Sequence, residues 1–409
     1  MNLIFLLFFG AIFSLILFGY LKPGFVFPNS TYIYLKEGKI STSKRTAYFA
    51  FILFAVTVFL VISSFQYINT ADYARWPMGG WSNDMSRYWF GFQDAHGLSL
   101  RKFLLTQGQE PLYIAFIWIM RKLTSHFSVV LLVAYTFVFV SCLKFLRDFI
   151  LFRCTPPPEN QEFAEQPLAF TTFSFFCLFY SFILVSFCLF RMGLAVAVSL
   201  YTYRYLLKGK YMKAYGTTLI ACGFHFSAAF LFPVCVVYKV YQSKKFKFSF
   251  FLSLFFILFL VGMAGAKAVP SIMGALAGGR YTAYTNDGLA VNTYLTNFLL
   301  LLMVLYKRKN FLRTKQDSLY LVVMLSSFFI LDLQLILGIF YRMIMFTYPI
   351  TMLAIPRLWS VYKLKRKEMF VSLCARSFLV FYLVFFLYKF CVAGWSSYGL
   401  NAYRLFYFY

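Results

Sequence analysis

Two segments of the sequence place an ionisable side chain inside a long apolar run. Arg191 lies in Leu189–Ala195, and His225 lies further along the chain in the run 221–229. A charged side chain within a membrane span costs roughly 2.5–3.5 kcal/mol and is retained mainly where it faces a polar cavity. Arginine is well suited to bind phosphate, and histidine titrates near working pH and can act as a general base. The two residues therefore indicate chemistry on an anionic substrate.

The rest of the chain has the composition of a membrane protein. Its 409 residues are 61% hydrophobic and 13% charged, whereas soluble domains carry roughly 25% charged residues. Because a bilayer span needs about 20 apolar residues, we expect an all-α, polytopic helix bundle with about 12 transmembrane helices in a single integral membrane domain over residues 1–409. The expected spans are 2–20, 47–66, 128–146, 168–189, 192–207, 213–225, 226–241, 249–266, 291–306, 318–338, 342–356 and 371–391.

The basic residues indicate how the helices cross the membrane. The net charge of +26 could suggest nucleic acid, but the basic side chains form short clusters between apolar runs, so no nucleic-acid partner is expected. Most of these clusters, including 307–315 and 357–376, face the cytoplasm if both termini face outward, in agreement with the positive-inside rule. This topology gathers polar residues from distant segments on the outer side: Asp84, Arg87, Glu110, Arg191, His225, Arg280 and Arg342.

The first outer loop, residues 67–110, has the composition of a glycan-binding loop. It contains Trp81, Asp84, Arg87 and Tyr88. Aromatic rings can stack on the apolar faces of sugars, while Asp and Arg can hydrogen-bond to sugar hydroxyl groups. An aromatic belt at the membrane interface is the alternative interpretation, because Trp and Tyr also gather at headgroup depth.

Glu110-Pro111 has the pattern of a helix start, with Pro at the first position and a carboxylate at the positive end of the helix. The apolar run that follows is too short to span the bilayer, so residues 111–123 are expected to form a re-entrant or interfacial helix. Glu110 is then either a helix cap or a carboxylate of the functional site.

Arg191 and Arg342 each precede an expected helix that enters the membrane from the outer side. The free N–H groups and the dipole at such a helix start favour anions, so each arginine is a candidate phosphate ligand. The alternative is that each side chain extends to the phosphate groups of membrane lipids. His225 is expected in a tight outer turn between two short spans, where it is either part of the site or a buried structural histidine.

The second outer loop, residues 267–290, is rich in glycine and contains Arg280 and Tyr281. It matches neither the P-loop nor the dinucleotide-binding fingerprint, because the order Gly-Lys-Ser/Thr and the strand context are absent. We expect a mobile lid that brings Arg280 over the cavity.

In this order, the motifs resemble the EpsG-like branch of the Wzy polysaccharide repeat-unit polymerases over residues 47–360. The shared segments are Asp84 with Tyr88, then 110–113, 191–195, 203–206 and 224–228, followed by Arg280-Tyr281 and Arg342. The lead-in Ser82-Asn83-Asp84 departs from the Gly-Thr-Asp-like pattern of the family. The resemblance implies a multi-pass protein of the bacterial inner membrane that builds O-antigen, capsule or exopolysaccharide at the outer face. Its substrate would be an oligosaccharide linked to undecaprenyl diphosphate, and a separate chain-length regulator would be a further partner.

These substrates suggest roles for the outer residues. Arginines can stabilise the charge that develops on a leaving diphosphate, and a general base must take the proton of the acceptor hydroxyl group. The diphosphate ligands are expected to be Arg191, Arg280 and Arg342, and the glycan contacts Arg87, Tyr88, Trp81 and Tyr281. The candidate bases, in order, are His225, Glu110 and Asp84. The outer side has no Asp-x-Asp motif, so we expect neither a metal nor another cofactor.

Three other functions fit parts of this pattern. A lipid-linked oligosaccharide flippase or transporter would also place cations in a membrane cavity, but such proteins tend to have internal repeats and midplane polar groups, and the sequence shows no repeat. An O-antigen ligase would use the same donor with another acceptor. A membrane O-acyltransferase would need an intramembrane histidine but not several arginines.

Overall fold

The computed structural model describes residues 84–154, 189–243, 249–253, 256–257, 260, 291–336, 341–362 and 366–388. Every regular element within these ranges is a helix, as the sequence predicts. The expected spans 2–20 and 47–66, nearly all of 168–189, most of 249–266 and the outer loop 267–290 lie outside the described residues. The chain divides into one unit of residues 1–200, 220–226 and 383–409, and a second unit of 201–219 and 227–382.

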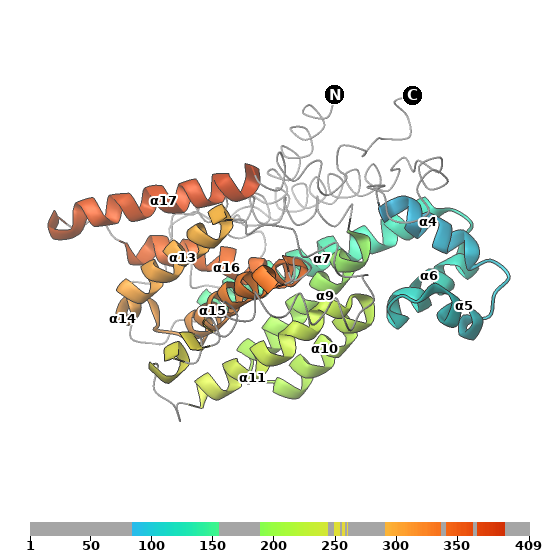
Figure 1. Cartoon of the computed structure of the whole chain (residues 1–409), viewed down its shortest axis with the longest axis horizontal. Helices are drawn as coiled ribbons and strands as arrows, with labels where there is room; N and C mark the ends of the chain where they lie inside the picture. Colours follow the sequence, from blue (N-terminus) through green and yellow to red (C-terminus); the bar gives the residue numbers. More distant parts are fainter. Residues whose placement is uncertain are drawn as a thin grey trace, which may run out of the picture. The chain divides into compact units, whose positions relative to one another are not determined.

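Two short helices of the first unit lie within the segment predicted as an outer loop. They are α4 (Asp84–Asp94) and α5 (Leu100–Gln107), and both pack against α6 (Pro111–Leu123) (Figure 1). The Ser99 hydroxyl group accepts a hydrogen bond from the N–H of Lys102 at the start of α5, and Trp118 donates to the carbonyl of Leu98 at 2.9 Å. Because Phe92 and Phe103 are buried, tertiary packing stabilises helices that are too short to be stable alone.

The next helix, α7 (Phe127–Cys154), provides one long apolar segment. Its residues Phe127–Phe145 are, within the described part of the chain, the single unbent helix long and apolar enough to cross a membrane. The predicted span 128–146 agrees with this segment, and the helix then continues to Cys154. A second segment passes the same test if the two bent halves of α16, described below, are counted as one span.

Four consecutive elements surround His225 in the sequence. They are α9 (Phe190–Leu207), α10 (Tyr211–Phe224), the 3₁₀ helix η2 (Phe226–Phe230) and α11 (Leu231–Gln242). Gly209 ends α9 with φ 67°, and the N–H groups of Gly209 and Lys210 donate to the carbonyls of Leu206 and Tyr205. This pairing is a Schellman motif, which a residue with positive φ makes possible. The predicted short spans agree with these helices within a few residues.

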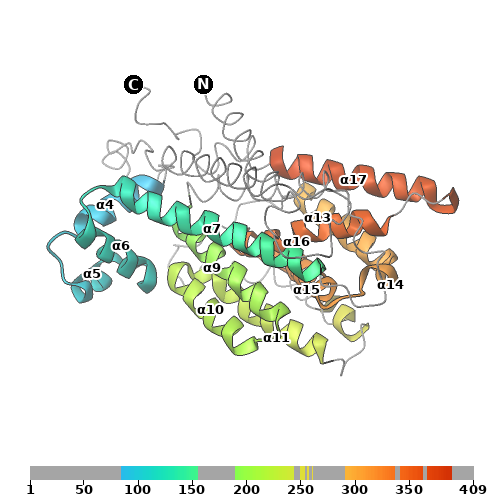
Figure 2. The same ribbon diagram turned by 180° about the vertical axis from the view of Figure 1, so that it is seen from behind.

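The second unit is centred on α15 (Lys315–Ile336), which packs against α11, α13 (Val291–Tyr306) and α16 (Tyr341–Val361) (Figure 2). The chain then forms η5 (Arg366–Glu368) and α17 (Met369–Tyr388). Helix α16 bends by 42° between Arg342–Thr351 and Leu353–Val361. Pro356 has no N–H to donate to the carbonyl of Met352, four residues earlier, and this accounts for the bend.

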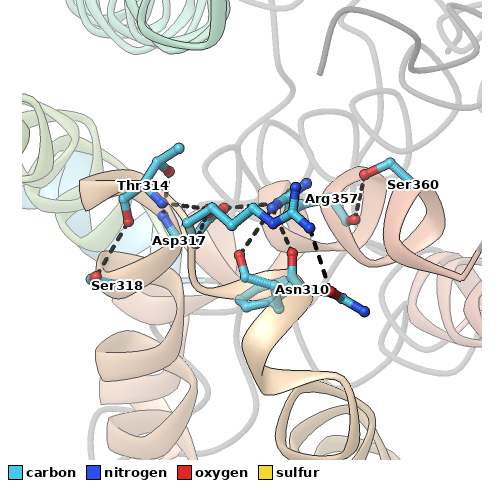
Figure 3. A network of polar contacts seen from close by, with 8 residues as sticks. Asn310, Thr314, Asp317, Ser318, Arg357 and Ser360 are labelled. Carbon is cyan, nitrogen blue, oxygen red and sulfur yellow. Dashed lines mark hydrogen bonds and ion pairs between the residues drawn. The ribbon is translucent and has the colours of Figure 1, made fainter. Parts of the chain in front are cut away.

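A buried ion pair joins the start of α15 to α16 (Figure 3). Arg357 donates from Nε to Asp317 Oδ1 at 3.0 Å, and from Nη2 to the carbonyls of Asn310 and Phe311 in the short helix α14 (Arg308–Phe311). Asp317 and Thr314 also exchange hydrogen bonds through their side chains and N–H groups, which is a capping box at the start of α15. Arg357 thus lies in a helix, where the sequence suggested a basic inner loop.

Candidate functional site

The first unit contains an ion pair between Arg191, at the start of α9, and Glu110, at the start of α6. Arg191 Nη1 lies 2.5 Å from Glu110 Oε2, and 18% and 17% of the two side chains are exposed. The contact joins positions that are 81 residues apart in the sequence. Two of the polar residues expected on the outer side are therefore in direct contact.

The Glu110 carboxylate connects three elements. Glu110 occupies the N-cap position of α6, but its side chain makes no capping hydrogen bond to that helix. Its second oxygen, Oε1, instead accepts a hydrogen bond from the N–H of Phe226 at 3.3 Å. Phe226 begins η2 and directly follows His225. His225 is buried, with 8% of its surface exposed. One carboxylate thus links the starts of α6, α9 and η2, next to the histidine.

Aromatic rings enclose the Arg191 guanidinium group. Its central carbon lies 5.7 Å from the ring centre of Tyr88 and 5.6 Å from that of Tyr113, which are distances of a cation–π interaction. These two rings and that of Phe190 also pack edge to face or tilted against one another. Tyr88 and Tyr113 are each 3% exposed. Tyr88, a predicted glycan contact, therefore lies against Arg191 in this structure and helps to fix its position.

The surroundings of Glu110 determine its protonation. Burial is the largest influence and raises the pKa of Glu110, but Arg191, the N–H groups of Glu110 and Phe226, and His225 together outweigh it and hold the pKa below its ordinary value. The carboxylate is consequently ionised at neutral pH. A carboxylate with a lowered pKa is a weak proton acceptor, because the best general base has a pKa near the working pH.

A close contact between α10 and α6 positions the carboxylate. Gly223, in the last turn of α10, lies so near Leu112 that a Cβ atom at Gly223 would be 2.5 Å from Leu112 Cγ. Leu112 is the second residue of α6 and follows Glu110 by two positions. The absence of a side chain at Gly223 therefore allows the start of α6 to approach the end of α10, where Phe226 and His225 follow.

The other predicted site residues have different positions. Asp84 begins α4, and its side chain lies outside the described residues. Arg87 is exposed on α4. Arg342 is half-buried in the first turn of α16, in the second unit. Trp81, Arg280 and Tyr281 lie outside the described residues.

Sequence reasoning did not single out Tyr113, Phe190, Gly223 or the N–H of Phe226 as parts of this cluster. Tyr113 lies three residues after Glu110, a spacing that places two side chains on the same face of a helix. Gly223 lies two residues before His225 in an otherwise apolar run. Both signals were visible in the sequence, but their partners are distant along the chain.

A comparison with protein families identifies the chain, because the model of the EpsG family matches residues 73–405. The chain belongs to the EpsG family. This family consists of Wzy-like polysaccharide polymerase-related proteins, and the family predicted from the motifs is confirmed. Together with its apolar helices, membership identifies a membrane protein related to polysaccharide biosynthesis. No curated protein and no solved structure matches the chain.

Proposed function

We propose that this EpsG-family protein is a membrane glycosyltransferase that polymerises oligosaccharide repeat units linked to undecaprenyl diphosphate. It would act at the outer face of the bacterial inner membrane as a multi-pass protein and produce O-antigen, capsule or exopolysaccharide. The observation that carries the proposal is the cluster of Arg191, Glu110 and His225. It combines an arginine that can bind an anion with two groups that can exchange protons. In the reaction, the bond between the donor sugar and the diphosphate breaks, and the sugar forms a bond to an acceptor hydroxyl group.

Arg191 is the proposed ligand of the donor diphosphate. The leaving diphosphate takes the electron pair of the broken bond and gains negative charge, so a fixed cation nearby stabilises the transition state more than the ground state. The rings of Tyr88 and Tyr113 hold the guanidinium group in place. We assign Arg280 and Arg342 to the same diphosphate. Arginines can supply the charge that a divalent metal ion supplies elsewhere, so we propose a metal-independent reaction.

His225 is the proposed general base. It takes the proton of the acceptor hydroxyl group as that oxygen attacks the donor sugar. The lowered pKa of Glu110 makes this carboxylate a weaker candidate than a histidine, whose ordinary pKa is about 6.5. Asp84 stays a lower-ranked candidate. Glycan binding is assigned to Trp81, Arg87 and Tyr281.

The test is incubation of purified protein with a defined repeat unit on undecaprenyl diphosphate, followed by sizing of the products. A ladder of longer glycans supports the proposal. Movement of the substrate across the bilayer without new bonds would indicate a flippase, and transfer only to a lipid A core would indicate a ligase. A chelator should leave the rate unchanged, and inhibition that magnesium reverses would contradict metal independence.

Variants make this test specific to the cluster. Arg191→Ala should abolish the ladder without preventing membrane insertion. His225→Ala should stop turnover, while donor binding is retained. Arg101→Ala is the matched control, because Arg101 is exposed on α5 in the same unit. Full activity of Arg191→Ala would remove this arginine from the mechanism.

A further inference from the structure

The nitrogens of Arg191 differ in their surroundings. Nη1 is bonded to Glu110, whereas Nε is buried and has no hydrogen-bond partner among the described residues. Since Nε is enclosed, an incoming anion meets the guanidinium group at its terminal nitrogens. One of these terminal nitrogens already carries the Glu110 carboxylate.

We propose that Glu110 occupies the phosphate-binding position of Arg191 in the substrate-free protein, and that a lipid diphosphate displaces it towards His225. The displaced carboxylate then stabilises the imidazolium ion that forms when His225 accepts the proton of the acceptor. Glu110 is thus a positioning residue. This inference rests on the proposed function, in which Arg191 binds the diphosphate and His225 is the base.

The charges favour this exchange. A diphosphate offers more negative charge and more acceptor oxygens than a carboxylate, and arginine can bind a phosphate group through two parallel hydrogen bonds. Glu110 and a diphosphate on the same guanidinium group would repel each other. The carboxylate would then move towards His225, which also contributes to the lowered pKa of Glu110.

The Glu110 carboxylate already binds the segment that carries His225. Glu110 Oε1 accepts a hydrogen bond from the N–H of Phe226, the residue that follows His225. The proposed exchange is a rotation of the Glu110 side chain from Arg191 to His225, with the backbone of α6 in place. A carboxylate beside a catalytic histidine stabilises the protonated ring and orients it, as in the Ser-His-Asp triad.

The experiment measures binding of undecaprenyl diphosphate, without sugar, to the purified full-length protein. Glu110→Gln removes the competing charge but keeps the size of the side chain, so the Kd should fall about tenfold, as expected for one nearby charge in a partly buried site. Asp94→Asn is the control, because Asp94 is an exposed acid in the same unit, and its Kd should be unchanged. In the Arg191→Ala background, Glu110→Gln should have no effect, because Glu110 and the diphosphate then have no arginine to compete for.

The same variant should show opposite changes in the two steps of the reaction. Glu110→Gln should lower the KM for the donor and reduce kcat about hundredfold, because the base loses its supporting charge. A merely structural role would instead raise KM. Unchanged or weaker diphosphate binding by Glu110→Gln would overturn the proposal, and so would an unchanged kcat.

If Glu110→Gln does not fold, Glu110→Asp replaces it. The shorter side chain keeps the charge but reaches Nη1 less well, so diphosphate binding should tighten by a smaller factor, and the absence of any tightening would overturn the exchange. The proposed function fails by a different result. A wild-type protein that binds diphosphate but makes no polymer refutes the polymerase, while the Kd values still test the exchange.

Discussion

Gly223→Ala should separate Glu110 from its partners without changing any charged group. The new Cβ atom would lie 2.5 Å from Cγ and Cδ1 of Leu112, and 3.0 Å from its Cβ. Carbon atoms pack at about 3.5–4.0 Å, so the start of α6 must move away by about 1 Å. A new rotamer of Leu112 relieves only part of the clash, because its Cβ is fixed to the backbone. A displacement of about 1 Å can reduce a catalytic rate about a hundredfold.

The assay for this variant is the rate of polymer formation from a defined lipid-diphosphate repeat unit, normalised to the protein in the membrane. Gly216→Ala is the control, because Gly216 lies in the same helix and has no atom within 4 Å of an added Cβ. The double variant Gly223→Ala/Leu112→Ala should recover part of the activity, because it removes the contacts with Cγ and Cδ1 and keeps the one with Cβ. Leu112→Ala alone should have a mild effect, since Leu112 is 39% exposed. A wild-type rate for Gly223→Ala, or no rescue by the second substitution, would refute the steric argument.

Three further predictions concern the charged groups. Arg191→Lys should lose the glycan ladder as Arg191→Ala does, because a point charge cannot form the paired hydrogen bonds of a guanidinium group, and retained activity would show that charge alone suffices. Arg357→Met should destabilise the start of α15 by about 3–5 kcal/mol, because it leaves a buried carboxylate without its ion-pair partner. Hydrogen exchange at residues 310–318 measures this loss of stability. Lys307→Gln is the comparison: it breaks an ion pair whose Glu368 side chain is 46% exposed, so it should lower the stability by at most about 1 kcal/mol. The pKa of Glu110 is lower in the folded protein than the ordinary carboxyl value of about 4.3. Its ion pair therefore stabilises the fold fully above about pH 4.3, and this stabilisation is lost as the pH falls through the lower pKa of the folded state. The Tm of the wild type should exceed that of Glu110→Gln at pH 7, and the difference in Tm should shrink in acid. A Tm difference that does not depend on pH would contradict the ion pair.

Local sequence signals predicted several helices well. The expected segments 111–123 and 291–306 have the bounds of α6 and α13, because Pro111 marks a helix start and an apolar run of this length favours a helix over a strand. The helices α4 and α5 were predicted as parts of a loop. They have only 11 and 8 residues, and such short helices depend on tertiary packing that the local pattern does not reveal.

The candidate site was predictable in its residue types but not in its pairing. The predicted topology groups Arg191, Glu110 and His225 on one side of the membrane, but a topology prediction does not show that the first two are in contact. That contact depends on the close approach of α6 and α10 at Gly223, which is a tertiary feature. The run of basic residues after Arg357 predicts a basic loop there, and no local signal indicates that α16 continues past it to Val361.

Two ion pairs among the described residues, Arg191–Glu110 and Arg357–Asp317, lie mostly out of solvent. They differ in how many hydrogen bonds their arginine makes. Arg357 uses Nε and Nη2 for Asp317 and two backbone carbonyls, and the other oxygen of Asp317 caps α15. Such a network stabilises one local structure. Arg191 has one carboxylate partner, two aromatic rings and a buried Nε with no partner among the described residues.

This difference suggests separate roles for the two pairs. A buried ion pair often contributes little net stability compared with apolar residues of similar size, so an incompletely satisfied pair is not explained by stability alone. The Arg191 guanidinium group is held by one ionised carboxylate, so a diphosphate that displaces this carboxylate can bind at the terminal nitrogens. In the other pair, Arg357 also binds two backbone carbonyls and Asp317 caps α15, which is why we assign Asp317–Arg357 to the fold and Arg191–Glu110 to function.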